Sequence, residues 1–282
     1  MTMLTFEKAL KAVLVHEGGW SDHKADPGGQ TMKGVIQRVY DGYRKRKGHA
    51  LRSVRQIEDA ELREIYKAQY WDVVRGDDLP AGVDYAVFDG AVNSGPSQSV
   101  KWLQRALGNV KVDGAIGEAT LAAVASHPDH DRLIAAICER RMAFLKALKT
   151  WRDFGKGWTA RVDGVRKLGQ AWASGSVGPT PIYSAQGAAK AVIADAKPAA
   201  TKGAADAATG ASMGFGAAGA ALNEAKDALT PLAGSGGWID SAVAALALTS
   251  ALGLVGGIGW RWYASRRDKE RADALDLQGV AA

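Results

Sequence analysis

An acidic side chain near the N-terminus stands where it could donate a proton. Apolar side chains recur at helical spacing over residues 6–14, Glu17 continues the same face, and a glycine pair at 18–19 follows. An apolar face and the C-terminal end of a helix both favour the neutral form of a carboxyl group. We therefore expect Glu17 to keep its proton and to act as a general acid.

A second set of polar residues follows in a predicted turn. Residues 26–29 read DPGG, a strong turn signal that would carry Asp26 and Thr31 back toward Glu17. Cleavage of a glycosidic bond uses a proton donor together with a second carboxylate, which stabilises positive charge or activates water. Asp26 is the candidate for that second role and Thr31 for holding the water. The simpler interpretations, a turn cap and a hairpin residue, remain open.

The elements that must position these residues are mostly helical. Apolar residues recur with a helical period over the first 174 residues, and any sheet is expected to be at most a small hairpin between Trp20 and Val39. Beyond the first helix, the pattern predicts helices over 57–74, 97–107, 118–126, 130–150 and 157–172. The expected fold class is therefore mainly α.

Composition limits the function classes. The 282-residue chain has a formal net charge of +6, which suits any polyanion but does not select one. We expect no nucleic-acid partner, because only net charge favours one. Cys138 is the single cysteine, so the chain can form no internal disulfide. The histidines lack metal-binding spacing, and we expect neither a metal nor a cofactor.

The composition changes after residue 174. Residues 175–236 are rich in Ala and Gly and are expected to form a flexible linker. The uncharged run 241–260 would span about 30 Å as a helix, so we expect a single transmembrane helix over 237–263. Aromatic residues stand at its ends, at Trp238 and at 260–263, as in interfacial belts.

The flanks of this helix predict its orientation. Residues 264–282 form a basic tail, which is expected to face the cytoplasm, with the N-terminal domain in the periplasm and the helix in the bacterial inner membrane at 238–263. Residues 1–11 do not resemble a signal peptide. Gly253 and Gly257 have the GxxxG spacing that could pair two such helices.

The N-terminal motifs resemble a known family. HEGGW at 16–20, DPGGQT at 26–31 and GV at 34–35 resemble glycoside hydrolase family 108, the N-acetylmuramidases of phages and prophages. The resemblance implies a lysozyme-like helical fold and matches Glu17 to the family's catalytic glutamate. Trp20 replaces the usual tyrosine. The spacing of Glu17, Asp26 and Thr31 also resembles the Glu, Asp and Thr set of phage lysozymes.

A second resemblance covers the rest of the globular region. Four segments resemble the predicted peptidoglycan-binding segment that follows this catalytic part; they are DGAVNSG at 89–95, WLQRALG at 102–108, VDGAIG at 112–117 and GKGW at 155–158. The resemblance implies a catalytic part over 1–92 and a helical part over 93–174 that completes the same fold.

Together these motifs predict a peptidoglycan hydrolase with an endolysin-like role and a phage or prophage origin. It would cleave the β-1,4 bond between N-acetylmuramic acid and N-acetylglucosamine, with Trp20, Gln30 and Asn93 contacting the sugars. Two alternatives stay open. A lytic transglycosylase needs one acidic residue and leaves an anhydro sugar, whereas a membrane-tethered wall-binding protein would release no product.

Overall fold

The computed structural model describes residues 2–22, 29–199 and 259–277. It divides into two units, of which the first contains Met1–Lys197 together with Ala274–Asp276. All residues of the candidate site that the structure describes lie in this first unit.

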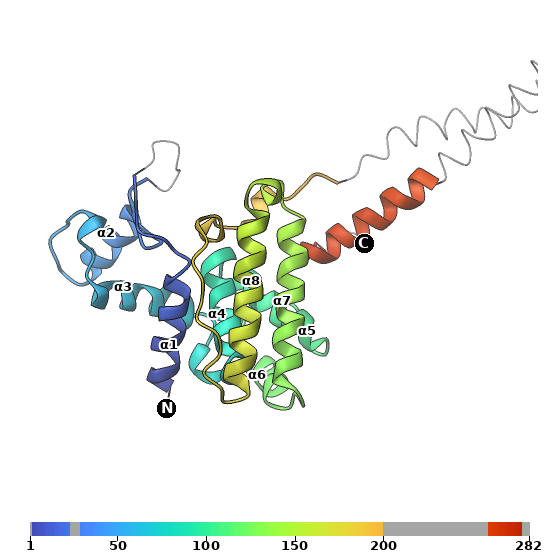
Figure 1. Cartoon of the computed structure of the whole chain (residues 1–282), viewed down its shortest axis with the longest axis horizontal. Helices are drawn as coiled ribbons and strands as arrows, with labels where there is room; N and C mark the ends of the chain where they lie inside the picture. The colour runs from blue at the N-terminus through green and yellow to red at the C-terminus, as the bar shows by residue number, and fades with distance from the viewer. Residues whose placement is uncertain (1, 23–28, 200–258, 278–282) are drawn as a thin grey trace, which may run out of the picture. The chain divides into compact units, whose positions relative to one another are not determined.

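The first unit is mainly helical with one small sheet, as the sequence predicts (Figure 1). Its α-helices are α1 (Thr2–Leu14), α2 (Gln37–Arg46), α3 (Asp59–Tyr66), α4 (Val83–Ser94), α5 (Pro96–Leu107), α6 (Glu118–Ala125), α7 (His130–Lys146) and α8 (Trp151–Ala173). Short helical turns are η1 (Val54–Gln56), η2 (Lys67–Trp71), η3 (Gly76–Asp78), η4 (Ala185–Ala188) and η5 (Ile193–Asp195).

The sheet has three antiparallel strands in the order β1-β2-β3, where the sequence predicted at most a hairpin. The strands are β1 (Trp20–Ser21), β2 (Thr31–Met32) and β3 (Val35–Ile36). Trp20 lies opposite Met32, and Thr31 lies opposite Ile36. The tight turn between β2 and β3 lets Val35 pair back on Met32, and this adds the third strand.

Helix α4 is the centre of the core. Eleven of its 12 residues are buried, and it contacts α1, α5, α7 and α8. A helix that is buried on all sides has no apolar stripe with a helical period, which explains why the sequence pattern did not predict it. Its buried polar residues include Asp89 and Asn93, so the core carries charge at its centre.

Helices α7 and α8 pack side by side against α4 (Figure 1). Each turns an apolar stripe toward the core, and each stripe contains one buried arginine, Arg141 on α7 and Arg161 on α8. The backbones of α4 and α8 meet at Gly82, where a Cβ atom would lie 2.1 Å from the Gly169 carbonyl oxygen. This close approach fixes α4 against α8 near the first turn of α4.

After α8 the chain doubles back along this helix (Figure 1). We call residues 176–197 the strap. At one end of α8 the indole Nε1 of Trp172 donates to the Val177 carbonyl oxygen at 3.0 Å. Just before the other end, the Lys197 N–H donates to the Ala147 carbonyl oxygen at 2.9 Å. The strap therefore spans the length of α8.

The globular unit thus extends further than expected. The composition of residues 175–236 predicted a flexible linker, but the described residues 176–197 belong to the first unit. Their ordering comes from polar contacts of their backbone with the helices, which composition does not reveal.

The second unit contains Pro198–Asp273 and Leu277–Ala282, and its described residues are helical from 259 to 273. Within the described part of the chain, no helix has the length and apolar character needed to cross a membrane. Most of the expected span at 237–263 lies outside the described residues, as do Gly253 and Gly257.

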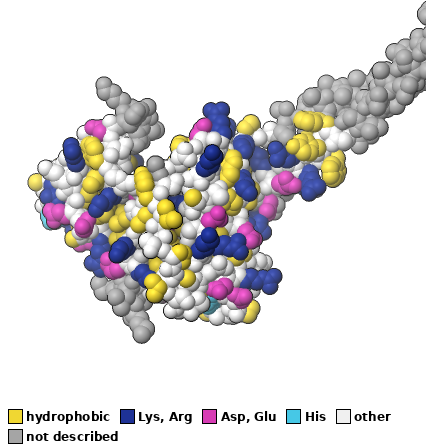
Figure 2. Space-filling view, viewed as in Figure 1, with side chains coloured by type: hydrophobic (Ala, Val, Ile, Leu, Met, Phe, Trp, Pro, Cys, Tyr) yellow, Lys and Arg dark blue, Asp and Glu magenta, His cyan; other side chains and the backbone are white. Residues whose placement is uncertain are grey.

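Charges of both signs are interspersed over the viewed face of the molecule (Figure 2). Among the described residues on that face, basic side chains do not form the continuous stripe that nucleic-acid-binding proteins present.

Asp84 is a buried carboxyl group in the first turn of α4. Its Oδ1 accepts hydrogen bonds from the backbone N–H groups of Gly82 at 2.7 Å and Tyr85 at 2.6 Å. Burial, which these two bonds oppose only in part, raises the pKa of Asp84 to about 7. Because the folded state holds the proton more tightly than the unfolded chain, the stability from this group is complete below about pH 4 and is lost as the pH rises toward 7.

Asp84→Asn keeps the acceptor oxygen but cannot become charged. We expect the variant and wild type to unfold at similar free energies near pH 4, and the variant to be more stable by up to about 4 kcal/mol near pH 8. Urea unfolding at several pH values measures the difference. The exposed Asp153→Asn serves as the control. An Asp84→Asn difference that does not change with pH would contradict the prediction.

Candidate active site

Glu17 lies in the turn between α1 and β1. Helix α1 ends at Leu14, three residues before Glu17. The sequence pattern predicted Glu17 at the C-terminal end of this helix, but Glu17 lies just beyond it. The Glu17 N–H donates to the Leu14 carbonyl oxygen at 3.3 Å, and the His16 N–H donates to that of Val13 at 2.9 Å. Gly18 then adopts a positive φ of +68° and turns the chain toward β1. The Glu17 side chain is only 1% exposed.

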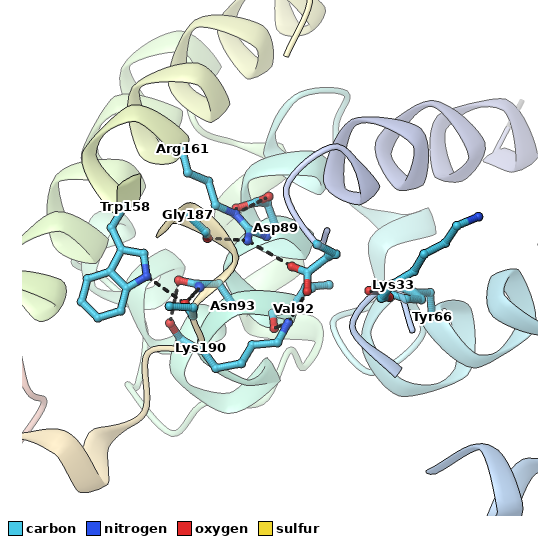
Figure 3. Close-up of polar contacts among 12 residues, drawn as sticks. Lys33, Tyr66, Asp89, Val92, Asn93, Trp158, Arg161, Gly187 and Lys190 are labelled. Carbon is cyan, nitrogen blue, oxygen red and sulfur yellow. Dashed lines mark hydrogen bonds and ion pairs between the residues drawn. The ribbon is translucent and has the colours of Figure 1, made fainter. Parts of the chain in front are cut away.

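Two cationic side chains bind the Glu17 carboxyl group (Figure 3). Nη1 of Arg161 donates to Oε1 at 3.0 Å, and Nζ of Lys190 donates to Oε2 at 2.6 Å. The prediction that the Glu17 carboxyl group has apolar surroundings is therefore wrong, because two cationic groups contact it. The two donors come from α8 and from the strap, 144 and 173 residues further along the chain, where local periodicity carries no information.

Arg161 is itself held by a buried carboxylate. Its Nε lies 3.0 and 3.1 Å from the two oxygens of Asp89, and Nη1 of Arg141 lies 2.6 Å from Asp89 Oδ1. Burial alone would raise the pKa of Asp89, but the two guanidinium groups hold it below its ordinary value. Asp89 is fully buried, so it anchors Arg161 beneath Glu17 and is not a candidate for the second carboxylate of a cleavage reaction.

Gly34 leaves room for the Glu17 carboxyl group. It has a φ of +78°, and a Cβ atom there would lie 2.7 Å from Glu17 Oε2 and 2.6 Å from the hydroxyl oxygen of Tyr66. The same hydroxyl donates to the Lys33 carbonyl oxygen at 2.8 Å, which fixes the turn between β2 and β3 (Figure 3). The turn of the sheet therefore borders Glu17 on the side away from α8.

Gly34→Ala is expected to lower activity on peptidoglycan by at least about tenfold, because the added methyl group must push the Glu17 carboxyl group from its position. The measurement is the initial rate of release of reducing ends from purified wall. Gly48→Ala is a matched control, since Gly48 has a similar φ of +70° but nothing within 4 Å of its Cβ position. Equal rates for the two variants would contradict the prediction.

Two other predicted site residues lie on the sheet. Thr31 begins β2, and its hydroxyl donates to the Gly29 carbonyl oxygen at 2.9 Å. Trp20 begins β1, and the guanidinium carbon of Arg55 lies 5.4 Å from the centre of its ring. Asp26 lies outside the described residues. The structure thus brings Thr31 and Trp20 to neighbouring strands just after Glu17, while the role proposed for Asp26 stays a prediction.

The remaining two candidates, Gln30 and Asn93, differ in their burial. Gln30 is exposed and donates from Nε2 to Asp22 Oδ2 at 3.1 Å. Asn93 is buried near the end of α4, where its Oδ1 accepts from Arg141 at 3.2 Å and its Nδ2 donates to the Ala189 carbonyl oxygen at 2.8 Å. Asn93 therefore joins the network around Glu17 and also contacts the strap.

The cationic side chains of this site were not predicted from the sequence. Arg141 and Arg161 interrupt apolar helical stripes, and a charged residue on a buried face is a signal that could have marked them. Lys190 lies in an Ala-rich segment that carries no such signal.

The comparisons with known proteins define the class. Residues 10–95 match the family model of glycosyl hydrolase 108, and residues 98–163 match that of a predicted peptidoglycan domain. Glu17 belongs to the first match, and Arg161 belongs to the second. These matches make the chain a glycoside hydrolase with a peptidoglycan domain.

One solved structure is a relative that matches this chain over nearly all of the relative's own length. The chain is 42% identical to the protein in the "Structure of Brucella abortus SagA", with a TM-score of 0.53, and the match covers 61% of this chain and 97% of that one. The chain therefore belongs to the glycosyl hydrolase 108 family. No curated protein gave a significant match.

Proposed function

We propose that this protein is an N-acetylmuramidase that hydrolyses the β-1,4 bond between N-acetylmuramic acid and N-acetylglucosamine, with Glu17 as the proton donor. The observation that carries the proposal is the position of the Glu17 carboxyl group, which is buried beside the turn of the sheet and held on one oxygen by Arg161 of α8. A catalytic acid must be kept in one orientation relative to its substrate.

The network assigns different tasks to the two oxygens of Glu17. Oε1 accepts from the buried Arg161, which is bound to Asp89, and this contact orients the carboxyl group. Oε2 is the oxygen that would carry the proton and pass it to the glycosidic oxygen, once Lys190 no longer binds it. A second carboxylate or a positioned water then completes the reaction, and Asp26 with Thr31 remains the proposal for this step.

The decisive experiment is the analysis of products. The full chain is incubated with purified peptidoglycan, and the soluble muropeptides are identified by mass spectrometry after borohydride reduction. A muramidase releases N-acetylmuramic acid with water added at its reducing end, which borohydride reduces. Anhydro ends would instead identify a lytic transglycosylase, and wall binding without products would identify a non-catalytic wall-binding protein.

We also propose an endolysin-like role in lysis from the inner membrane. Support for membrane attachment comes from the uncharged run at 241–260 and the basic residues that follow it. In bacteria that express the full chain, we expect the protein to stay with the membrane after carbonate extraction. Its release into the soluble fraction would contradict membrane attachment.

A further inference from the structure

The strap occupies polar atoms of the candidate site itself. Besides Glu17, the ammonium group of Lys190 donates to the Val92 carbonyl oxygen at 3.0 Å. The Gly187 carbonyl oxygen accepts from Nη1 of Arg161 at 3.0 Å, the same nitrogen that binds Glu17 (Figure 3). The strap therefore competes for the groups that the proposed reaction uses.

The backbone of the strap is bound through one carbonyl group and one N–H group. Two side chains donate to the Ala189 carbonyl oxygen, Nε1 of Trp158 at 2.8 Å and Nδ2 of Asn93 at 2.8 Å. In the opposite direction, the Ala191 N–H donates to the Asn93 carbonyl oxygen at 3.0 Å. The site thus offers two donors to a carbonyl group and one acceptor to an N–H group. The two groups belong to successive peptide groups of the strap. A peptidoglycan strand also presents carbonyl and N–H groups, through its N-acetyl groups.

Close backbone packing seats the strap on α8. Gly157 has no side chain, and a Cβ atom there would lie 2.4 Å from Cβ of Gln186 in the strap. The Lys190 side chain is 39% exposed, whereas that of Glu17 is 1% exposed. Solvent therefore reaches the contact from the side of the strap, and this is the side from which the strap can leave.

We propose that residues 187–191 occupy this enzyme's own glycan-binding site. The Ala189 carbonyl group occupies the position in which Trp158 and Asn93 bind the carbonyl group of a substrate N-acetyl group. Lys190 blocks Oε2 of Glu17, the proposed proton donor. The strap is then a competitive internal inhibitor, and the enzyme works only in the fraction of molecules whose strap has left the site. This inference rests on the proposed function, because it takes the ligand to be an N-acetylated glycan.

Two variants of the full chain displace the strap from opposite sides. Lys190→Glu places a carboxylate against Glu17, and Gly157→Ala places a methyl group where Gln186 lies. Lys156→Glu is the matched control, since it makes the same charge change at an exposed position of α8. Circular dichroism confirms that each variant is folded, and agreement between the two displacing variants makes the result independent of either one alone.

The probe is the soluble tetramer of N-acetylglucosamine, with binding measured by calorimetry. We expect both displacing variants to bind the tetramer at least about tenfold more tightly than wild type or Lys156→Glu, because charge-assisted contacts of the strap no longer compete. Adding Trp158→Phe, which keeps an aromatic ring but removes the indole N–H, is expected to cancel the gain. On peptidoglycan, the displacing variants should show a raised kcat/KM.

The outcomes separate this inference from the proposed function. Equal affinity of all chains for the tetramer, including no binding by any of them, would overturn the inference, as would a gain that survives Trp158→Phe. If both displacing variants bind more tightly but no chain cleaves peptidoglycan, the strap covers a glycan-binding site and the hydrolase proposal fails.

Discussion

Glu17→Gln is expected to lower the rate of peptidoglycan cleavage by about 10²–10⁴-fold, the contribution of a general acid. The amide has the shape of the carboxyl group and can still accept from Arg161 through its oxygen. It has no proton of suitable acidity for the glycosidic oxygen. Its NH₂ group also faces the ammonium group of Lys190 and cannot accept from it. We therefore expect the loss in kcat, with glycan binding no weaker than in wild type.

The control for this prediction is Glu7→Gln, the same chemical change on α1. Glu7 is partly exposed and pairs with Arg63, so its replacement is expected to leave the cleavage rate unchanged. Rates come from reducing-end assays on purified wall, and thermal unfolding shows that both variants keep the fold. Cleavage by Glu17→Gln at the wild-type rate would remove Glu17 from the mechanism.

Local patterns predicted the helices that have one apolar face. The predicted spans at 97–107 and 118–126 agree closely with α5 and α6. The span predicted over 57–74 ends earlier as an α-helix, at Tyr66, because the chain continues as the wider π turn η2. Helix α4 was not predicted, because burial on every side removes the contrast between an apolar and a polar face that marks a helix in the sequence.

The same limit applies to the site. Glu17 could be singled out as a candidate, since it lies beside a glycine pair and ahead of a turn, which are local signals in the sequence. Its partners could not, because Arg161 and Lys190 reach it only after α8 and the strap have packed. A candidate marked by local turns could therefore be proposed from the sequence, whereas contacts between distant segments required the structure.

Asp89→Asn is expected to lower the free energy of unfolding by about 3–5 kcal/mol near neutral pH, the typical effect of removing one partner from a buried ion pair. Asp89 is the shared acceptor of Arg141 and Arg161, and the three side chains are at most 2% exposed. Asparagine removes the negative charge and turns an NH₂ group toward a guanidinium donor. Two positive charges then remain in the core with too few acceptors.

The pH dependence distinguishes this loss of charge from a simple loss of packing. Because the two arginines hold the pKa of Asp89 below its ordinary value, the stability it contributes is present above about pH 4 and is lost at lower pH. The difference between wild type and Asp89→Asn in urea unfolding should therefore shrink as the pH falls below about 4. A packing defect would give the same difference throughout. The exposed pair of Arg152 and Asp153 offers the control, since Asp153→Asn should change stability by less than about 1 kcal/mol.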